Sequence, residues 1–177
     1  RSAGSSTDSL RKGRSLAKLN LFNGRQAERI SESDAVAVIG LGRFGQSLAL
    51  ELMANGVDVL GVDGDQQVVQ GLDGRLTYVV MADATREDVL RQLSIPEFNR
   101  VVVAIGQDIG ASILAVSLLL RFGVPEIWAE AVSEAHGTVL EQLGVHHVIF
   151  PEKDMGRRVA HLVQGSLLDY IPLGGNF

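Results

Sequence analysis

The sequence predicts an α/β fold in which a doubly wound sheet of six parallel strands forms the core of one domain. Short aliphatic runs alternate with segments of helical periodicity from residue 34 onward, and such alternation is typical of parallel sheets. Aromatic residues make up only 5% of a chain that is 46% hydrophobic, so aliphatic side chains must build the core. Strands covered on both faces have this composition. The length of 177 residues suits one domain with appendages.

The expected strands are aliphatic runs bounded by Gly, Pro, Asp or a charged residue. A short continuous run of this kind indicates a strand buried on both faces. The runs cover 35–39, which ends at a glycine, 57–62, which ends at an aspartate, then 76–80, 100–105, 125–131 and 145–150.

The segments between these strands place apolar residues three or four positions apart, which predicts helices. Phe44, Leu48 and Leu52 show this spacing in the first of them, and Asn55-Gly56 closes it. The segment over 109–122 is apolar on most sides, so we expect it to pack on the sheet and on another subunit. The expected helices cover 43–55, 65–72, 87–93, 109–122 and 133–143, and a last one begins at Pro151.

These elements divide the chain into three parts. The composition of residues 1–33, rich in Ser, Gly, Arg and Asn, predicts a basic flexible tail. The alternative is a basic arm that touches a membrane or a partner. Residues 34–150 form the α/β domain. We expect residues 151–177 to contain a helix that leaves the domain and then the start of a truncated C-terminal region. The apolar stripe of this helix predicts at least a dimer, because such a stripe is not expected to stay exposed in a monomer.

Composition excludes several classes of function. The chain has no cysteine, which excludes disulfides and cysteine-based metal or redox chemistry and fits a reducing cytosol. Residues 34–177 are acidic within a chain of net charge −5, which argues against nucleic-acid binding. No apolar run approaches the ~20 residues that span a bilayer, and no signal peptide is visible. We therefore expect no direct membrane insertion, and any contact with a membrane to be made through a partner.

The motif Gly40-Leu41-Gly42-Arg43-Phe44-Gly45 follows an expected strand and opens an expected helix, and Asp63 ends the next strand. This context predicts a Rossmann-like dinucleotide fold. Gly40 permits a tight turn, Gly42 lets the backbone approach a phosphate, and Gly45 lets the helix pack closely. Free N–H groups and the helix dipole attract phosphates. Asp63 is placed to bind ribose hydroxyls and to repel a 2′-phosphate, which disfavours NADP; the alternative is that the glycines serve only the turn.

Further candidates lie near the same edge of the sheet. Arg43 at a helix N-terminus is unfavourable for the helix dipole, so it indicates an anionic partner, unless it is simply solvated. The natural partner is a terminal phosphate, on this subunit's nucleotide or on a neighbour's. Asp83 either contacts the edge of the adenine or caps a helix. Thr85 either lies near the adenine as well or only serves as the N-cap of the next helix. Open α/β sheets bind ligands at the carboxyl ends of their strands, and two segments follow the third and fourth strands: Ala82-Asp83-Ala84-Thr85 and Ile105-Gly106-Gln107-Asp108.

Nothing in the sequence indicates catalysis. The four histidines show no metal-ligand spacing, and no Ser-His-Asp order or Lys with a positioned base is visible. No second domain holds a substrate beside a nicotinamide ring. We therefore expect a chain that is not an enzyme. The competing interpretations are a fragment of an NAD-dependent oxidoreductase, which shares the fold and Asp63, and a purely structural oligomerisation module.

Residues 35 to about 173 resemble the RCK, or KTN (TrkA-N), domain of bacterial potassium-channel regulators, especially the Ktr type. The resemblance is carried by VAVIGLGRFGQSLALEL, VLGVDGD, ADAT, VVVAIGQDIGAS, IW and VLEQLGVHHVIFPEKDMGRRVA. It implies a cytoplasmic regulatory subunit that binds ATP or ADP, with NAD(H) as the alternative. It also implies dimers within an octameric ring, docked through a membrane potassium-translocating subunit on the inner face of the cell membrane. Nucleotide exchange in such a ring changes its shape and gates potassium flux.

The resemblance also assigns roles to residues. Asp63 would hold the ribose, and the helix from Pro151 would be the crossover helix that swaps onto a neighbour. Glu141 matches a position whose carboxylate binds a divalent cation, Mg²⁺ or Ca²⁺, in Ktr-type members. The alternative is a glutamate that is simply solvated on an exposed helix face. Glu130 departs from the family, where Lys or Arg is common, and an acid there disfavours a highly charged nucleotide. The remaining expected contacts are with the phosphates (Gly40, Gly42, Arg43, Phe44, Gly45), the adenine (Asp83, Ala84, Thr85) and the far wall (Ile105, Gly106, Asp108).

Overall fold

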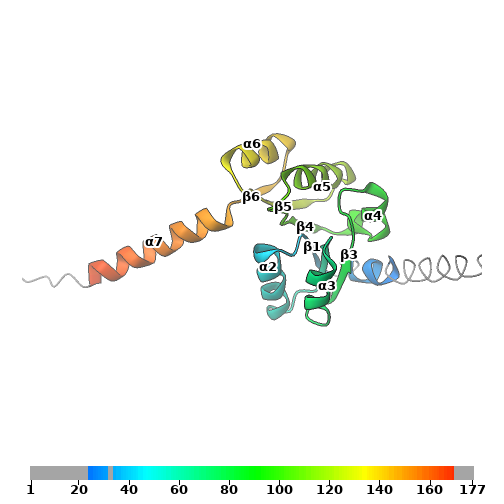
Figure 1. Ribbon diagram of the computed structural model, residues 1–177, viewed down its shortest axis with the longest axis horizontal. Coiled ribbons are helices and arrows are strands. Elements are labelled where there is room, and N and C mark those ends of the chain that lie inside the picture. Colours follow the sequence, from blue (N-terminus) through cyan, green and yellow to red (C-terminus); the bar gives the residue numbers. More distant parts are fainter. Residues whose placement is uncertain (1–23, 32–33, 170–177) are drawn as a thin grey trace, which may run out of the picture.

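The computed structural model describes residues 24–31 and 34–169 (Figure 1). Its centre is one six-stranded sheet in the order β3-β2-β1-β4-β5-β6, and every neighbouring pair is parallel. The predicted doubly wound sheet is therefore confirmed. The strands are β1 (Val36–Ile39), β2 (Val59–Asp63), β3 (Tyr78–Met81), β4 (Arg100–Val103), β5 (Glu126–Glu130) and β6 (His147–Ile149).

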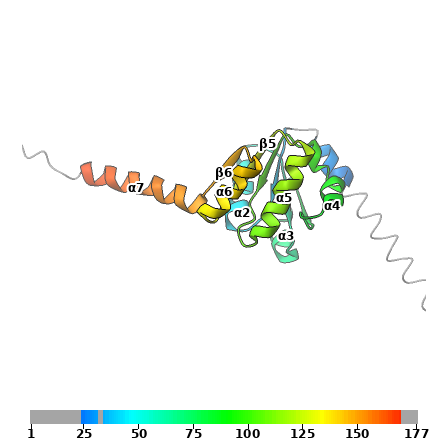
Figure 2. The same cartoon turned by 90° about the horizontal axis from the view of Figure 1, so that it is seen from above.

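Helices cover both faces of the sheet, as Figures 1 and 2 show. Helices α2 and α3 lie on one face, and α4, α5 and α6 lie on the other. The helix predicted over 109–122 and the start predicted at Pro151 are both confirmed. The helices are α2 (Arg43–Ala54), α3 (Gln66–Leu72), α4 (Glu87–Gln92), α5 (Ile109–Phe122), α6 (Glu134–Leu143) and α7 (Pro151–Asp169), with a short 3₁₀ turn at Ile95–Glu97.

Strand β1 shows why the core has two halves. All four of its residues are buried, and successive side chains point to opposite faces. Val36 and Val38 join the cluster beneath α2 and α3, whereas Ala37 and Ile39 join the larger cluster beneath α4, α5 and α6. Burial on both faces explains why the strands appear in the sequence as continuous aliphatic runs.

Three predicted strand starts, at residues 57, 76 and 145, are two residues too early, and two of them share one cause. Val57 and Val145 were expected to begin strands, but their N–H groups bond back to the carbonyls of Leu52 and Leu140. They therefore close α2 and α6, and the strands begin two residues later. A valine that caps a helix and a valine that opens a strand look alike in an aliphatic run.

The expected flexible tail over 1–33 is wrong for its last part. Residues 24–31 form a helix, and Ala27 and Ile30 are buried in the larger core cluster. Ser31 donates a hydrogen bond to the Glu28 carbonyl one turn earlier. These residues are spaced to place a small apolar face on the domain, which is enough to dock one short helix. Residues 1–23 and 32–33 lie outside the described residues.

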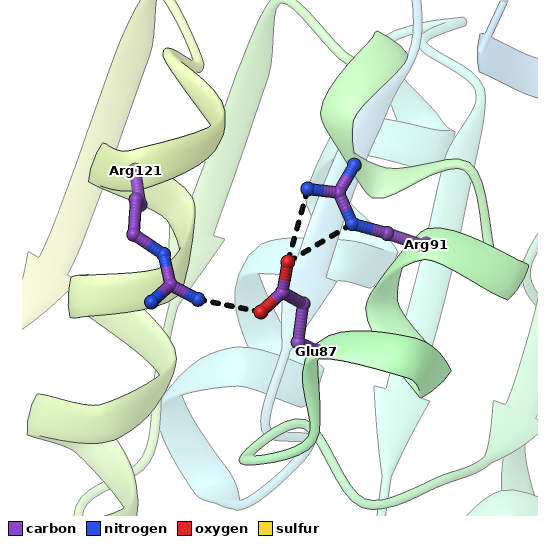
Figure 3. A network of polar contacts seen from close by, with 3 residues as sticks. All are labelled: Glu87, Arg91 and Arg121. Atoms are coloured by element: carbon purple, nitrogen blue, oxygen red, sulfur yellow. Dashed lines mark hydrogen bonds and ion pairs between the residues drawn. The ribbon is translucent and has the colours of Figure 1, made fainter.

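A polar network ties α4 to α5 on the surface (Figure 3). One oxygen of Glu87 accepts from Arg91, one turn along α4, and the other accepts from Arg121 of α5. The Arg91 guanidinium also lies 4.7 Å from the centre of the Phe122 ring. Because these groups are largely exposed, each ion pair contributes only about 0–1 kcal/mol.

Helix α7 extends away from the α/β domain in both views (Figures 1 and 2). Its predicted apolar stripe is exposed at four positions, with Leu162 at 66%. The expected extended segment after it, over 170–173, lies outside the described residues. Among the described helices, none is long and apolar enough to cross a membrane. The exposed stripe consists of Met155, Val159, Leu162 and Val163.

Candidate nucleotide-binding site

A cleft of about 1690 Å³ lies at the carboxyl ends of β1 to β5. The turns that follow these strands line it, and the first residues of α7 close one side. The cleft therefore lies where open α/β sheets bind ligands. Ten of the predicted site residues line it: Gly40, Gly42, Arg43, Phe44, Asp63, Asp83, Ala84, Thr85, Ile105 and Gly106.

The three glycines of the motif have different environments. Gly40 has φ +94°, and a Cβ there would lie 2.4 Å from the Ala104 carbonyl oxygen. A Cβ at Gly45 would lie 1.9 Å from the Gly40 carbonyl oxygen, so α2 approaches the turn too closely for any side chain. A Cβ at Gly42 would meet nothing within 4 Å. Gly40 and Gly45 thus fix the backbone, while Gly42 leaves open space in the cleft.

The N-terminus of α2 carries no acidic group of its own. Gly42 is the N-cap and offers no side-chain acceptor, and the first turn contains no Asp or Glu. The first N–H groups of a helix have no partner within it, and its dipole attracts anions. The other described helices that border the cleft, α3, α5, α6 and α7, each have an acid at the cap or in the first turn. The α2 terminus is therefore the one best suited to a phosphate.

Asp63 connects the end of β2 to the glycine turn. Its Oδ2 accepts from the Leu41 N–H at 2.8 Å, and its Oδ1 accepts from the Asp65 N–H at 2.8 Å. Each carboxylate oxygen has a further lone pair, so both can still accept a hydrogen bond from a ligand hydroxyl. These two bonds hold the carboxylate at the mouth of the cleft beside the α2 terminus.

Asp83 and Thr85 form a small turn after β3. Asp83 Oδ1 accepts from the Thr85 hydroxyl at 2.6 Å and from the Thr85 N–H at 2.9 Å. The hydroxyl bond and then the backbone bond lower the pKa of the Asp83 carboxyl, so it stays ionised. The N-cap of α4 is Arg86, so the alternative that Thr85 caps this helix is wrong. The turn is held rigid with its edge on the cleft.

Three predicted residues do not line the cleft. Gly45 packs behind the turn, and Asp108 caps α5 by accepting from the Ala111 N–H at 2.9 Å. Glu141 is exposed on the second half of α6, away from the lining residues. The described residues contain no cluster of three His, Cys, Asp or Glu that could hold a metal ion. The metal role of Glu141 stays a prediction.

Charged residues line the far side of the cleft: Glu130, which the sequence had already singled out, and three that it had not, Glu134, Glu152 and Lys153. Glu130, at the end of β5, is half-buried, and burial followed by the charge of Glu152 raises the pKa of its carboxyl. Lys153 of α7 forms an ion pair with Glu134 of α6 at 2.6 Å. Glu130 was named from the sequence, and Glu134 could have been found because it follows closely after β5. Nothing local in the sequence shows that α7 begins at the rim of the cleft, so Glu152 and Lys153 could be found only from the fold.

His136 is buried behind the cleft and is not an ordinary surface histidine. Its Nδ1 accepts from the Val132 N–H at 3.2 Å, so the neutral ring carries its proton on Nε2, 3.1 Å from the Ser112 hydroxyl. Burial lowers the pKa of His136. Because Val132 lines the cleft, this pair of bonds holds one wall in place.

The model of the TrkA-N domain matches residues 36–151, which is most of the described chain. The chain belongs to the TrkA-N domain family. The match spans all six strands and ends where α7 begins. The resemblance to this family stated from the sequence is thereby confirmed.

Curated relatives of this TrkA-N chain include two proteins of Bacillus subtilis (strain 168). Ktr system potassium uptake protein A is 43% identical over 142 residues, covering 80% of this chain and 64% of the relative. Ktr system potassium uptake protein C is 41% identical over 138 residues, covering 77% and 62%. The chain thus spans slightly less than two thirds of the length of these relatives.

Among solved structures, the TrkA-N chain is similar to the GsuK channel bound to NAD, with a TM-score of 0.58 and 16% identity. The match covers 65% of this chain and 21% of the channel. A structure of GsuK bound to ADP matches with a TM-score of 0.57 and the same identity, covering 65% and 30%. At this identity the likeness concerns the fold alone.

Proposed function

We propose that this chain is the nucleotide-binding part of a cytoplasmic regulatory subunit that controls a membrane potassium-translocating subunit. The cleft binds an adenine nucleotide, ATP or ADP, with NAD(H) as the alternative ligand. The observation that carries the proposal is the bare N-terminus of α2 beside the Asp63 carboxylate. The free N–H groups of the α2 N-terminus suit a diphosphate, and the Asp63 carboxylate suits ribose hydroxyls.

In this binding mode the phosphates lie over Gly42 and against the first turn of α2, with Arg43 and Phe44 beside them. The ribose hydroxyls donate to Asp63, and the adenine lies at the Asp83–Thr85 turn. The far wall consists of Ile105, Gly106 and the residues at the end of β5. The names of the Ktr relatives support a role in potassium uptake, and the GsuK structures with NAD and ADP support an adenine nucleotide as the ligand.

The chain acts as a regulator and not as an enzyme. A nucleotide shifts a conformational equilibrium only through its different affinities for the two states. Arg43 is the group proposed to sense the terminal phosphate, and exchange of one nucleotide for another changes the shape of an oligomeric ring. The exposed stripe of α7 supports at least a dimer, in which a neighbour covers it. An octameric ring and a divalent cation at Glu141 belong to the same proposal.

The experiment measures thermal unfolding with ATP, ADP, NADH and NADPH, with and without Mg²⁺. A ligand at about 100 times its Kd stabilises the fold by ~2.7 kcal/mol, which raises Tm by several degrees. ATP or ADP is expected to give this shift, Asp63→Ala to abolish it, and the matched control Asp73→Ala on exposed surface to retain it.

The ligand panel also separates the alternatives. A shift with NADH alone would favour a redox-sensing regulator or an oxidoreductase fragment. No shift with any nucleotide would leave only a structural module. Potassium uptake by vesicles that contain the membrane subunit of the same organism then tests regulation, since uptake must change when the stabilising nucleotide is added.

A further inference from the structure

The cleft has two halves on either side of the glycine turn. The strand order places β2 and β3 on one side of β1, and β4 and β5 on the other. Asp63 and Asp83 therefore lie on the near side, while Gly106 and Glu130 lie on the far side. If the ribose binds Asp63 and the diphosphate binds α2, as the proposed function states, any group beyond the second phosphate enters the far half.

The far half carries an excess of negative charge. Three carboxylates, those of Glu130, Glu134 and Glu152, line it together with one ammonium group, that of Lys153. Lys153 is already engaged by Glu134 at 2.6 Å. Within the described part of the chain, no cation lies at ion-pair distance from Glu130 or Glu152. A further anionic group that enters this half of the cleft is therefore repelled by carboxylates that no cation neutralises.

Glu130 is the best placed of these carboxylates to contact a ligand. It ends β5, and its Oε1 lies against the backbone of the turn after β4, where a Cβ at Gly106 would be only 3.2 Å away. Burial and the nearby Glu152 raise the pKa of its carboxyl, so its surroundings already oppose negative charge. The helices that begin nearby do not compensate, because Asp108 caps α5 and Glu134 and Glu152 lie in the first turns of α6 and α7.

We propose that Glu130 is a specificity-determining residue that disfavours a third phosphate, so that the cleft binds ADP in preference to ATP. A carboxylate repels a terminal phosphate but accepts hydrogen bonds from sugar hydroxyls. A dinucleotide, whose second phosphate continues into an uncharged sugar, is therefore not penalised. Arg43, at the glycine turn, attracts the terminal phosphate that Glu130 repels. The balance of these two interactions sets the ratio of the affinities for ATP and ADP.

The test is calorimetric titration of ATP, ADP and NAD in EDTA, which keeps divalent cations from masking the charge. Wild-type protein is expected to bind ADP more tightly than ATP. Glu130→Gln removes the charge at nearly constant shape and is expected to tighten ATP about tenfold, or about 1.4 kcal/mol, with ADP and NAD within about twofold. The control is Glu51→Gln on the exposed side of α2, which is expected to change neither ratio.

Each outcome decides between the two proposals. Tighter binding of ATP than ADP by the wild type, or an unchanged ATP/ADP ratio in Glu130→Gln, would overturn the role of Glu130 and leave nucleotide binding standing. Failure of all three ligands to bind folded wild-type protein would overturn the proposed function and this inference with it. Glu152→Gln supplies a second variant, for which a smaller change in the same direction is expected.

Discussion

Substituting alanine for Gly42 and for Gly45, in separate variants, distinguishes effects on folding from effects on nucleotide binding. At Gly45 an added Cβ would lie 1.9 Å from the Gly40 carbonyl oxygen, a backbone atom that cannot move aside cheaply. Overpacking of this kind costs about 1–3 kcal/mol, and at about 2–4 °C per kcal/mol the Tm of Gly45→Ala is expected to fall by roughly 2–12 °C. At Gly42 the Cβ would meet nothing within 4 Å.

Gly42→Ala is therefore expected to fold with a free energy of unfolding within about 1 kcal/mol of wild type, since loss of a glycine N-cap and reduced chain entropy nearly cancel. Its methyl group projects into the space that a phosphate would occupy. Nucleotide affinity is expected to fall at least tenfold, about 1.4 kcal/mol. Thermal melting measures the first quantity and calorimetric titration with ADP the second.

The reasoning would be refuted in either of two ways. If Gly42→Ala bound ADP as the wild type does, no phosphate would approach the backbone at this turn. If Gly45→Ala melted at the wild-type temperature, the close approach of α2 to the glycine turn would not limit the fold.

Two other predictions concern stability. Ile30→Ala should cost about 2–5 kcal/mol because Ile30 is buried in the core, while Arg25→Ala on the exposed side of the same helix should change Tm little; equal melting temperatures would mean that the helix is not docked. The lowered pKa of buried His136 means that the unfolded chain binds the extra proton first, so stability should fall as pH drops below about 6.5. His136→Gln should melt with a shallower pH dependence between pH 7.5 and 5.5, and an unchanged slope would count against the neutral ring.

The order of elements was predictable because each strand is an aliphatic run buried on both faces. Where the predicted boundaries were wrong, hydrogen bonds or tertiary packing decided the conformation, and hydrophobic periodicity does not reveal these. The N–H groups of Val57 and Val145 complete the preceding helices, so the strands start later. The helix over 24–31 contributes few buried side chains, Ala27 and Ile30 among them, too few to stand out in a polar sequence.

The site was predictable where one strand and its turn define it. Asp63 ends a strand, and the glycine turn and the Asp83–Thr85 turn come just after one, so the rule for open α/β sheets places them at one cleft. Lys153 lines the cleft because α7 begins at the rim of the cleft. The position of this helix depends on the topology of the sheet and not on the local sequence. Glu141 shows a different case: its motif suggested a metal ligand, its side chain is exposed on α6, and the metal role stays a prediction.

A crystal structure of the chain with ADP would test the central claim most directly. The account predicts phosphate oxygens at about 2.7–3.2 Å from the first N–H groups of α2 and ribose hydroxyls at hydrogen-bond distance from Asp63. ADP bound elsewhere, or an empty cleft in crystals saturated with the nucleotide, would contradict the account.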